Sequence, residues 1–257
     1  MLELLQEERA ALINHTVTKG LDAAVPLRDS GIEWLGEVPA HWEVKRMKHL
    51  LIGLEQGWSP SCENREADLG EWGVLKVGCV NGLHFDASEN KALPAELVPM
   101  PEYEISAGDF LISRANTKEL VGSASIVEEV RPKLMLCDKL FRLYFNKSAN
   151  QEYILLVIGS SYGRFQIQTE CSGASSSMQN ISQEFLKNMV VLLPPQEEQR
   201  AIVEYVAEHS IRITETANTI NQEIALLQEY RAALIAEAVT GQIDVRNYEP
   251  ALAEVLM

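Results

Sequence analysis

Three polar segments carry most of the side chains whose chemistry suits binding to another molecule. Arg, Lys, Asn and Gln can pair with base edges, and Ser, Thr and Lys can bind phosphate oxygens. The residues singled out in segments 56–59, 114–118 and 171–179 are Gln56, Trp58, Ser59, Arg114, Asn116, Thr117, Lys118, Ser175, Ser176, Ser177 and Gln179. Lys76 and Arg164 are lesser candidates. These residue types suit contact with a nucleic acid without requiring it, and an ordinary polar loop is the alternative at each segment.

The expected contacts differ between the segments. Arg114 and Lys118 could reach guanine or phosphate, and Asn116 and Gln179 could pair with adenine. The serine-rich segment lacks bulk and could approach a phosphate backbone closely.

Signatures of catalysis are missing from the sequence. It contains no phosphate-binding loop, no dinucleotide-binding loop, no nucleophile elbow and no H-E-x-x-H. Asp109 with Glu104 could form a nuclease-like metal pair, but a tight turn into a strand at Gly108-Asp109 is the favoured interpretation. The four cysteines have no short pairing, which favours buried thiols over zinc ligands or disulfides. We therefore expect no catalytic residue, no metal and no cofactor.

The net charge of −15 is unusual for a protein that binds nucleic acid. Residues 45–193 hold 15 basic and 18 acidic side chains, and the flanks hold the remaining 7 and 19. The excess of acidic over basic residues therefore lies mostly outside the central region, which allows a basic face there without demanding one. The apolar runs are too short to span a membrane, and the acidic start does not resemble a signal peptide, so we expect a soluble, cytoplasmic protein.

The chain nearly repeats itself at its ends. Segments 4–22 and 226–244 are identical at twelve of nineteen positions, with a constant offset of 222 residues. The same helix-to-turn element therefore occurs before and after a long unique region.

A long helix is predicted from Gln196 to Val239. The 44 residues lack Gly and Pro, follow Pro194-Pro195, and are closed by Gly241. Its apolar positions recur at mostly three- and four-residue spacing, which suits packing against another helix. The positions expected to pair helices or dock partners are Leu5, Leu12, Ile202, Val206, Ile213, Ile220, Ile224, Leu227 and Leu234.

The region between the repeats has a different character. Short β-rich runs separated by Gly, Pro and Asn predict strands at 74–77, 109–113, 125–127 and 140–145. Helices are expected at 152–160 and 182–188, with Ser182 as a helix cap. The predicted fold is α+β, with a strand-rich domain beside a long helix that forms an antiparallel coiled coil. The predicted divisions are 1–43 (repeat and linker), 44–193 (domain), 194–244 (long helix) and 245–257 (tail).

Several sequence segments occur in an order that is typical of one protein family. They are Ser30–Gly36 with Val38–Glu43, Gly108–Arg114 with Val121-Gly122, Ser177–Ser182, Leu193–Gln199 and the end repeat. In this order they resemble the specificity (S) subunit of type I restriction–modification systems, over almost the whole chain. Ser30–Glu43 resembles the start of that family's target recognition domain, and Leu193–Gln199 resembles the start of its conserved helix.

The resemblance implies a non-catalytic protein that reads half of a split double-stranded DNA site. It also implies helices that dock methyltransferase (M) subunits and, through them, the restriction (R) subunit. This chain carries one recognition domain where the family has two, so we expect either a half-subunit or a fragment, and a homodimer through antiparallel long helices. The DNA half-site, and whether the chain binds DNA without its partners, do not follow from the sequence.

Two rival hypotheses compete with this interpretation. The first is an acidic helical interaction scaffold or DNA-mimic inhibitor. The charge split argues against the mimic, because the acid lies largely on helices that also need an apolar mate. The second is the nuclease with Asp109 and Glu104 as metal ligands.

Overall fold

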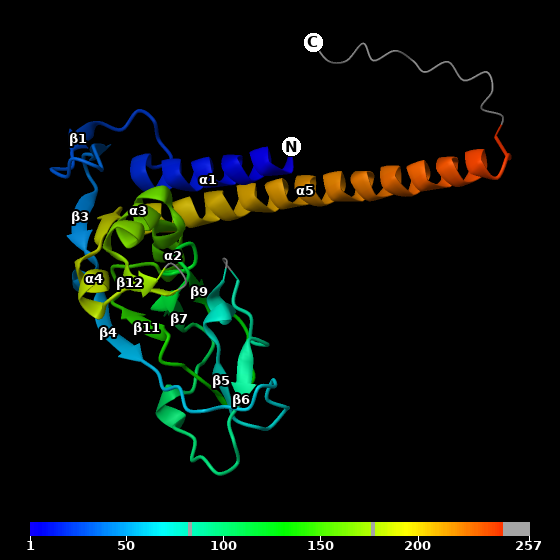
Figure 1. Cartoon of the computed structure of the whole chain (residues 1–257). Helices are drawn as coiled ribbons and strands as arrows, with labels where there is room; N and C mark the ends of the chain where they lie inside the picture. The colour runs from blue at the N-terminus through cyan, green and yellow to red at the C-terminus, as the bar shows by residue number, and fades with distance from the viewer. Residues whose placement is uncertain (82–83, 176–177, 244–257) are drawn as a thin grey trace.

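The computed structural model describes residues 1–81, 84–175 and 178–243. Its most prominent element is α5 (Gln196–Val239), whose bounds are those predicted. Helix α1 (Leu2–Lys19) lies along the first half of α5 in the antiparallel sense, and the second half of α5 extends well beyond the rest of the protein (Figure 1). The strand-rich domain lies at the start of α5. The predicted α+β architecture is confirmed.

A four-stranded antiparallel sheet forms the centre of the domain, in the order β4-β11-β7-β9. Its strands are β4 (Leu51–Gln56), β11 (Leu140–Phe145), β7 (Phe110–Ser113) and β9 (Ala124–Ile126). Strand β7 is buried along its whole length, as expected for a strand covered on both faces. The predictions for β7, β9 and β11 are confirmed to within one residue.

The outer part of the domain has its own smaller core beneath a three-stranded sheet, β10-β5-β6. These strands are β10 (Leu134–Met135), β5 (Gly73–Leu75) and β6 (Asn90–Ala92). The predicted strand at 74–77 ends early. The backbone of Lys76 still pairs with Glu89, but Cys79 then donates to the Lys76 carbonyl at 3.2 Å and closes a 3₁₀ turn, η2 (Val77–Val80). A further 3₁₀ turn, η3 (Pro101–Tyr103), lies in the same region.

Three short helices are capped by polar side chains, as helix starts require. They are α2 (Gln151–Gly159), α3 (Ser161–Glu170) and α4 (Gln183–Asn188), capped by Asn150, Ser160 and Ser182. The predicted cap at Ser182 is confirmed, since its hydroxyl accepts from the Phe185 N–H at 3.0 Å. Helix α3 was not predicted, because Ser160 both ends α2 and caps α3. Gly163 permits that corner, since a Cβ there would lie 2.1 Å from the Val157 carbonyl oxygen.

A compact joint connects the domain to the helices. Strand β3 (Glu43–Arg46) pairs antiparallel with β14 (Val190–Leu193), so the chain enters and leaves the domain side by side. The Glu198 carboxylate accepts from Trp42 Nε1 at 3.0 Å and lies 2.7 Å from His41 Nε2. Two segments of the sequence pattern, Val38–Glu43 and Leu193–Gln199, therefore meet in space. The short hairpin β1 (Leu27–Asp29) and β2 (Glu37–Pro39) precedes the joint, and η1 (Met47–His49) follows it.

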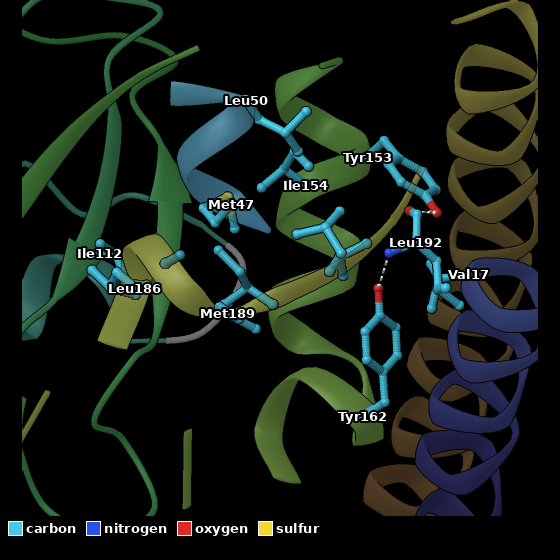
Figure 2. Close-up of a cluster of buried hydrophobic side chains, with 14 of the residues drawn as sticks. Val17, Met47, Leu50, Ile112, Tyr153, Ile154, Tyr162, Leu186, Met189 and Leu192 are labelled. Carbon is cyan, nitrogen blue, oxygen red and sulfur yellow. Dashed lines mark hydrogen bonds between the residues drawn. The ribbon is translucent and has the colours of Figure 1, made fainter. Parts of the chain in front are cut away.

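The main core is shared by the domain and both helices. Figure 2 shows Val17 of α1 near Leu192 of β14, Tyr153 of α2 and Tyr162 near the start of α3. The Tyr153 hydroxyl donates to the Leu192 carbonyl at 2.9 Å, and the Tyr162 hydroxyl accepts from the Leu192 N–H at 3.5 Å. Ile202 and Val206 of α5 belong to the same buried cluster. Within the described part of the chain, no helix combines the length and the apolar character needed to cross a membrane.

Candidate nucleic-acid interface

Two of the three predicted polar segments lie next to each other in one small sheet. Its strands are β12 (Ser172–Ser175), β13 (Met178–Asn180) and β8 (Ala115–Asn116), in that order. Gln179 lies opposite Asn116, and Asn180 opposite Ala115. The expected serine-rich loop is therefore a hairpin. Ser175 is placed through its backbone only, and Ser176 and Ser177 lie outside the described residues.

The turn at Asp138 connects the first polar segment to the second. Ser59 donates to the Asp138 carboxylate at 2.5 Å, and Gln56 Nε2 donates to the Asp138 carbonyl at 3.0 Å. The Arg114 guanidinium reaches the same carbonyl at 3.5 Å, the outer limit of a hydrogen bond. Trp58 is half-buried and packs against the outer core, so it anchors segment 56–59. The structure thus places all three predicted segments around one region of the surface.

Asn116 is held in a defined orientation at the centre of this region. Its Oδ1 accepts from the Thr117 N–H at 2.9 Å, and its Nδ2 donates to Asn81 Oδ1 at 3.2 Å. Lys118, two residues further on, is exposed. Asn81 was not singled out from the sequence, because only the folded chain brings residues 81 and 116 together.

A groove of about 590 Å³ beside the Asp138 turn gathers three lysines. They are Lys76, which was a lesser candidate, and Lys91 and Lys139, which sequence reasoning missed. Asp138 also lines the groove, and Glu89 lies 3.7 Å from Lys76, so the lysines have opposing charge beside them. The three lysines come from separate segments, and no local pattern in the sequence identifies them as neighbours. We call these three lysines, together with Arg114, Asn116 and Lys118, the recognition face.

Arg164 is bound to the back of the segment that follows β8. Its Nη1 donates to the Val121 carbonyl at 2.7 Å, and its Nη2 donates to the Glu119 carbonyl at 2.9 Å. Burial lowers the pKa of this guanidinium, with a smaller opposing effect from Cys171. These contacts support a positioning role for Arg164 behind the recognition face.

The proposed acidic metal pair is engaged elsewhere. Asp109 Oδ2 accepts from Arg142 Nη1 at 2.9 Å, and Glu104 Oε1 accepts from the Lys133 N–H at 2.6 Å. Across the described ranges, no group of three or more His, Cys, Asp and Glu side chains is arranged to hold a metal ion. The geometry gives the nuclease hypothesis no support.

The cysteines are all free thiols. Cys79 and Cys137 are buried, as expected, whereas Cys62 and Cys171 are only half-buried. Burial raises the pKa of Cys137 to about 12, so this thiol stays protonated near neutral pH.

The residues expected to pair helices fall into two groups. Ile202 and Val206 are buried inside this chain, and Leu5, Leu12 and Ile213 line a groove between α1 and α5. Ile224, Leu227 and Leu234 lie beyond the end of α1 and are 42%, 65% and 37% exposed. Among these nine predicted positions, the uncovered ones therefore lie in the second half of α5, and half-buried Ile220 lies at the boundary.

Comparison with known proteins identifies relatives over most of the chain. The family described as the type I restriction modification DNA specificity domain matches residues 39–226. The EcoEI specificity subunit of Escherichia coli is 33% identical over 197 residues, which cover 76% of this chain and 33% of that protein. The EcoKI specificity subunit of Escherichia coli K12 is 26% identical over 216 residues, covering 83% and 46%. The chain thus spans less than half the length of these two relatives.

Solved structures share the fold. A chain from a study of complex assembly and conformational transition in the type I R-M system superposes with a TM-score of 0.62 at 20% identity, covering 92% of this chain and 53% of that one. The HsdS subunit from Thermoanaerobacter tengcongensis gives 0.57 at 18% identity, covering 94% and 52%. At this level of identity the likeness concerns the fold.

Proposed function

Because this chain belongs to the type I restriction–modification DNA specificity family, we propose that its recognition face reads one half of a split double-stranded DNA site. The observation that carries this proposal is the convergence of three polar segments, distant in sequence, around Asn116 and the Asp138 turn. Direct readout needs amide and guanidinium groups held in fixed positions, and phosphate binding needs nearby cations. Asn116 and Arg114 provide the former, and Lys76, Lys91 and Lys139 provide the latter.

The chain acts in this proposal as a non-catalytic subunit. The methyltransferase and restriction subunits supply the chemistry, and the acidic helices α1 and α5 supply the surface on which methyltransferase subunits dock. The uncovered apolar positions of α5 pair with an antiparallel helix of the same kind, and in a homodimer that helix is the second copy of α5. The two recognition faces then lie at opposite ends of the helix pair.

The test is DNA binding by a complex reconstituted from this chain and a type I methyltransferase subunit. The half-site is first identified by selecting bound sequences from a random duplex library. We expect Asn116→Ala to relax the preference at one base pair, costing about 1–3 kcal/mol of discrimination there.

The combined change Lys91→Ala and Lys139→Ala should weaken binding to all sequences and flatten the dependence on salt. The control is Lys48→Ala. It removes one positive charge from η1, outside the recognition face. Loss of affinity with Lys48→Ala but not with Lys91→Ala and Lys139→Ala would place the DNA on another surface.

A further inference from the structure

The position of α1 defines a docking site on the first half of α5. At one end, Gly20 lies so close to α5 that a Cβ there would be 3.0 Å from Glu198 Oε1. At the other end, Leu5 and Leu12 share a groove with His209, Ile213 and neighbouring residues of α5. From residue 221 to 239 the side chains of α5 are exposed, apart from half-buried Ala238. The cover that α1 provides therefore ends at about Ile220.

The end of α5 repeats the helix that occupies this site. Four apolar positions of α1 that face α5 or the main core keep their identity in the repeat, because Leu5, Leu12, Ile13 and Val17 correspond to Leu227, Leu234, Ile235 and Val239. Buried Thr16 is replaced by Ala238. Ile13 and Val17 are buried, whereas Ile235 and Val239 are 53% and 82% exposed. The same apolar pattern thus occurs once in contact with its site and once without a partner in this chain.

The positions that differ include those where α1 binds the domain. Asn14 Oδ1 accepts from the Ser161 N–H at 2.5 Å, and Lys19 Nζ donates to the Glu37 carbonyl at 2.6 Å. The corresponding residues of the repeat are Ala236 and Gly241, which cannot make either bond. The repeat therefore keeps the four apolar residues of α1, but it has Gln242 in place of Gly20 at the close approach to Glu198, and it lacks the side-chain bonds to Ser161 and Glu37.

We infer that the end of α5 docks onto the first half of α5 in a second copy of this chain, in the place of α1. This inference rests on the antiparallel helix pairing proposed above and adds its register and its regulation. Residue 242, which corresponds to Gly20, then lies level with Glu198 of the second copy, and the two-fold axis passes near Ile220. Because α1 has the better contacts with the domain, it is an internal competitor that limits dimer formation.

Disulfide trapping of the full chain tests the register. Under mild oxidation, Ile220→Cys should form a covalent dimer, because the two copies of this residue meet at the axis. Asn218→Cys, on the opposite face of α5 at the same level, is the matched control, and the unaltered chain controls for the four native thiols. Arg231→Cys reports the alternative register, in which α1 stays in place and only the uncovered halves of α5 pair.

Changing the two versions of the helix tests the competition. Asn14→Ala removes a contact of α1, and Ala236→Asn supplies that contact to the repeat. Each should tighten the dimer several-fold in sedimentation, as expected for one hydrogen bond. A covalent dimer from Arg231→Cys but not Ile220→Cys overturns the inference, and so does a monomer in both Asn14→Ala and Ala236→Asn. These experiments use no DNA, so their failure is distinct from a failure of the recognition face.

Discussion

Arg142 of β11 shows how a single buried residue connects the two strands on either side of it, β4 and β7. The Arg142 side chain is 6% exposed, and its guanidinium binds the carboxylates of Glu55 in β4 and Asp109 just before β7. The guanidinium also donates to the carbonyls of Glu102 and Glu104. Burial lowers the pKa of this guanidinium, but the bonds to Asp109 and Glu55 outweigh it and the net direction is upward. Arg142 therefore stays charged, and its positive charge compensates the carboxylates of Glu55 and Asp109.

We predict that Arg142→Met lowers the free energy of unfolding by about 3 kcal/mol, the lower end for breaking a buried ion pair, because Glu55 is partly open to solvent. Arg65→Met is the matched control, since Arg65 pairs with Glu63 and Glu71 on the surface and should cost far less. Urea denaturation of both variants measures the difference. Equal losses would mean that the Arg142 network adds nothing beyond a surface pair.

A surface carboxylate, Glu71, gives a prediction about pH. Arg65 binds both of its oxygens and the Asp68 N–H binds one, which lowers the pKa of Glu71 to about 2 from an ordinary value of 4.5. A pKa that is lower in the folded state stabilises the fold above pH 4.5, and the contribution disappears as the pH falls toward 2. Glu71→Gln should therefore flatten the decline of the urea midpoint over that range, whereas Glu66→Gln in the same loop should leave it steeper. A parallel decline in the two variants would contradict the assignment.

At the scale of elements, the sequence predicted those parts of the fold that have their own local pattern. Helix α5 follows from its uninterrupted run and its flanking Pro and Gly, and β11 follows from six β-forming residues. Helix α3 was missed because its cap is also the end of α2, which hides the boundary in the sequence. The three polar segments of the site were also visible in the sequence. The lysine groove was not, because Lys76, Lys91 and Lys139 come together only through the β5–β6 pairing and the Asp138 turn.

Helix α3 also makes a prediction about how the recognition face is supported. Arg164→Met keeps most of the packing but removes both bonds to the carbonyls of Val121 and Glu119. We expect it to lower DNA affinity about tenfold through loss of order in residues 117–122, with an unchanged slope of affinity against salt. Arg164→Lys keeps the charge, and its DNA affinity should lie between those of the unaltered chain and Arg164→Met. If Arg164 touched phosphate directly, the slope would instead decrease by about one.

At the scale of the whole molecule, the helices and the domain differ in net charge, and α5 is long enough to extend well beyond the domain (Figure 1). In the proposed function, the net negative charge outside residues 45–193 disfavours contact of the helices with phosphates, and the nearly neutral domain presents the recognition face. If α5 separates two recognition faces, its length sets the unread spacer of the DNA site. Four helix-forming residues inserted after Ala225 add about 6 Å, roughly one turn, and so keep the apolar stripe nearly in phase.

Base pairs in B-form DNA rise by about 3.4 Å, so the insertion should lengthen the spacer by about one to two base pairs without changing either half-site. Mapping methylated sites in a reconstituted complex measures this. Four residues inserted at Gly31, where the β1–β2 turn has open space around it, are the control and should leave the spacer unchanged. An unchanged spacer after insertion in α5 would mean that the recognition faces are separated by something other than this helix. In that case, the dimer contact inferred for the end of α5 would not determine the spacing of the two half-sites.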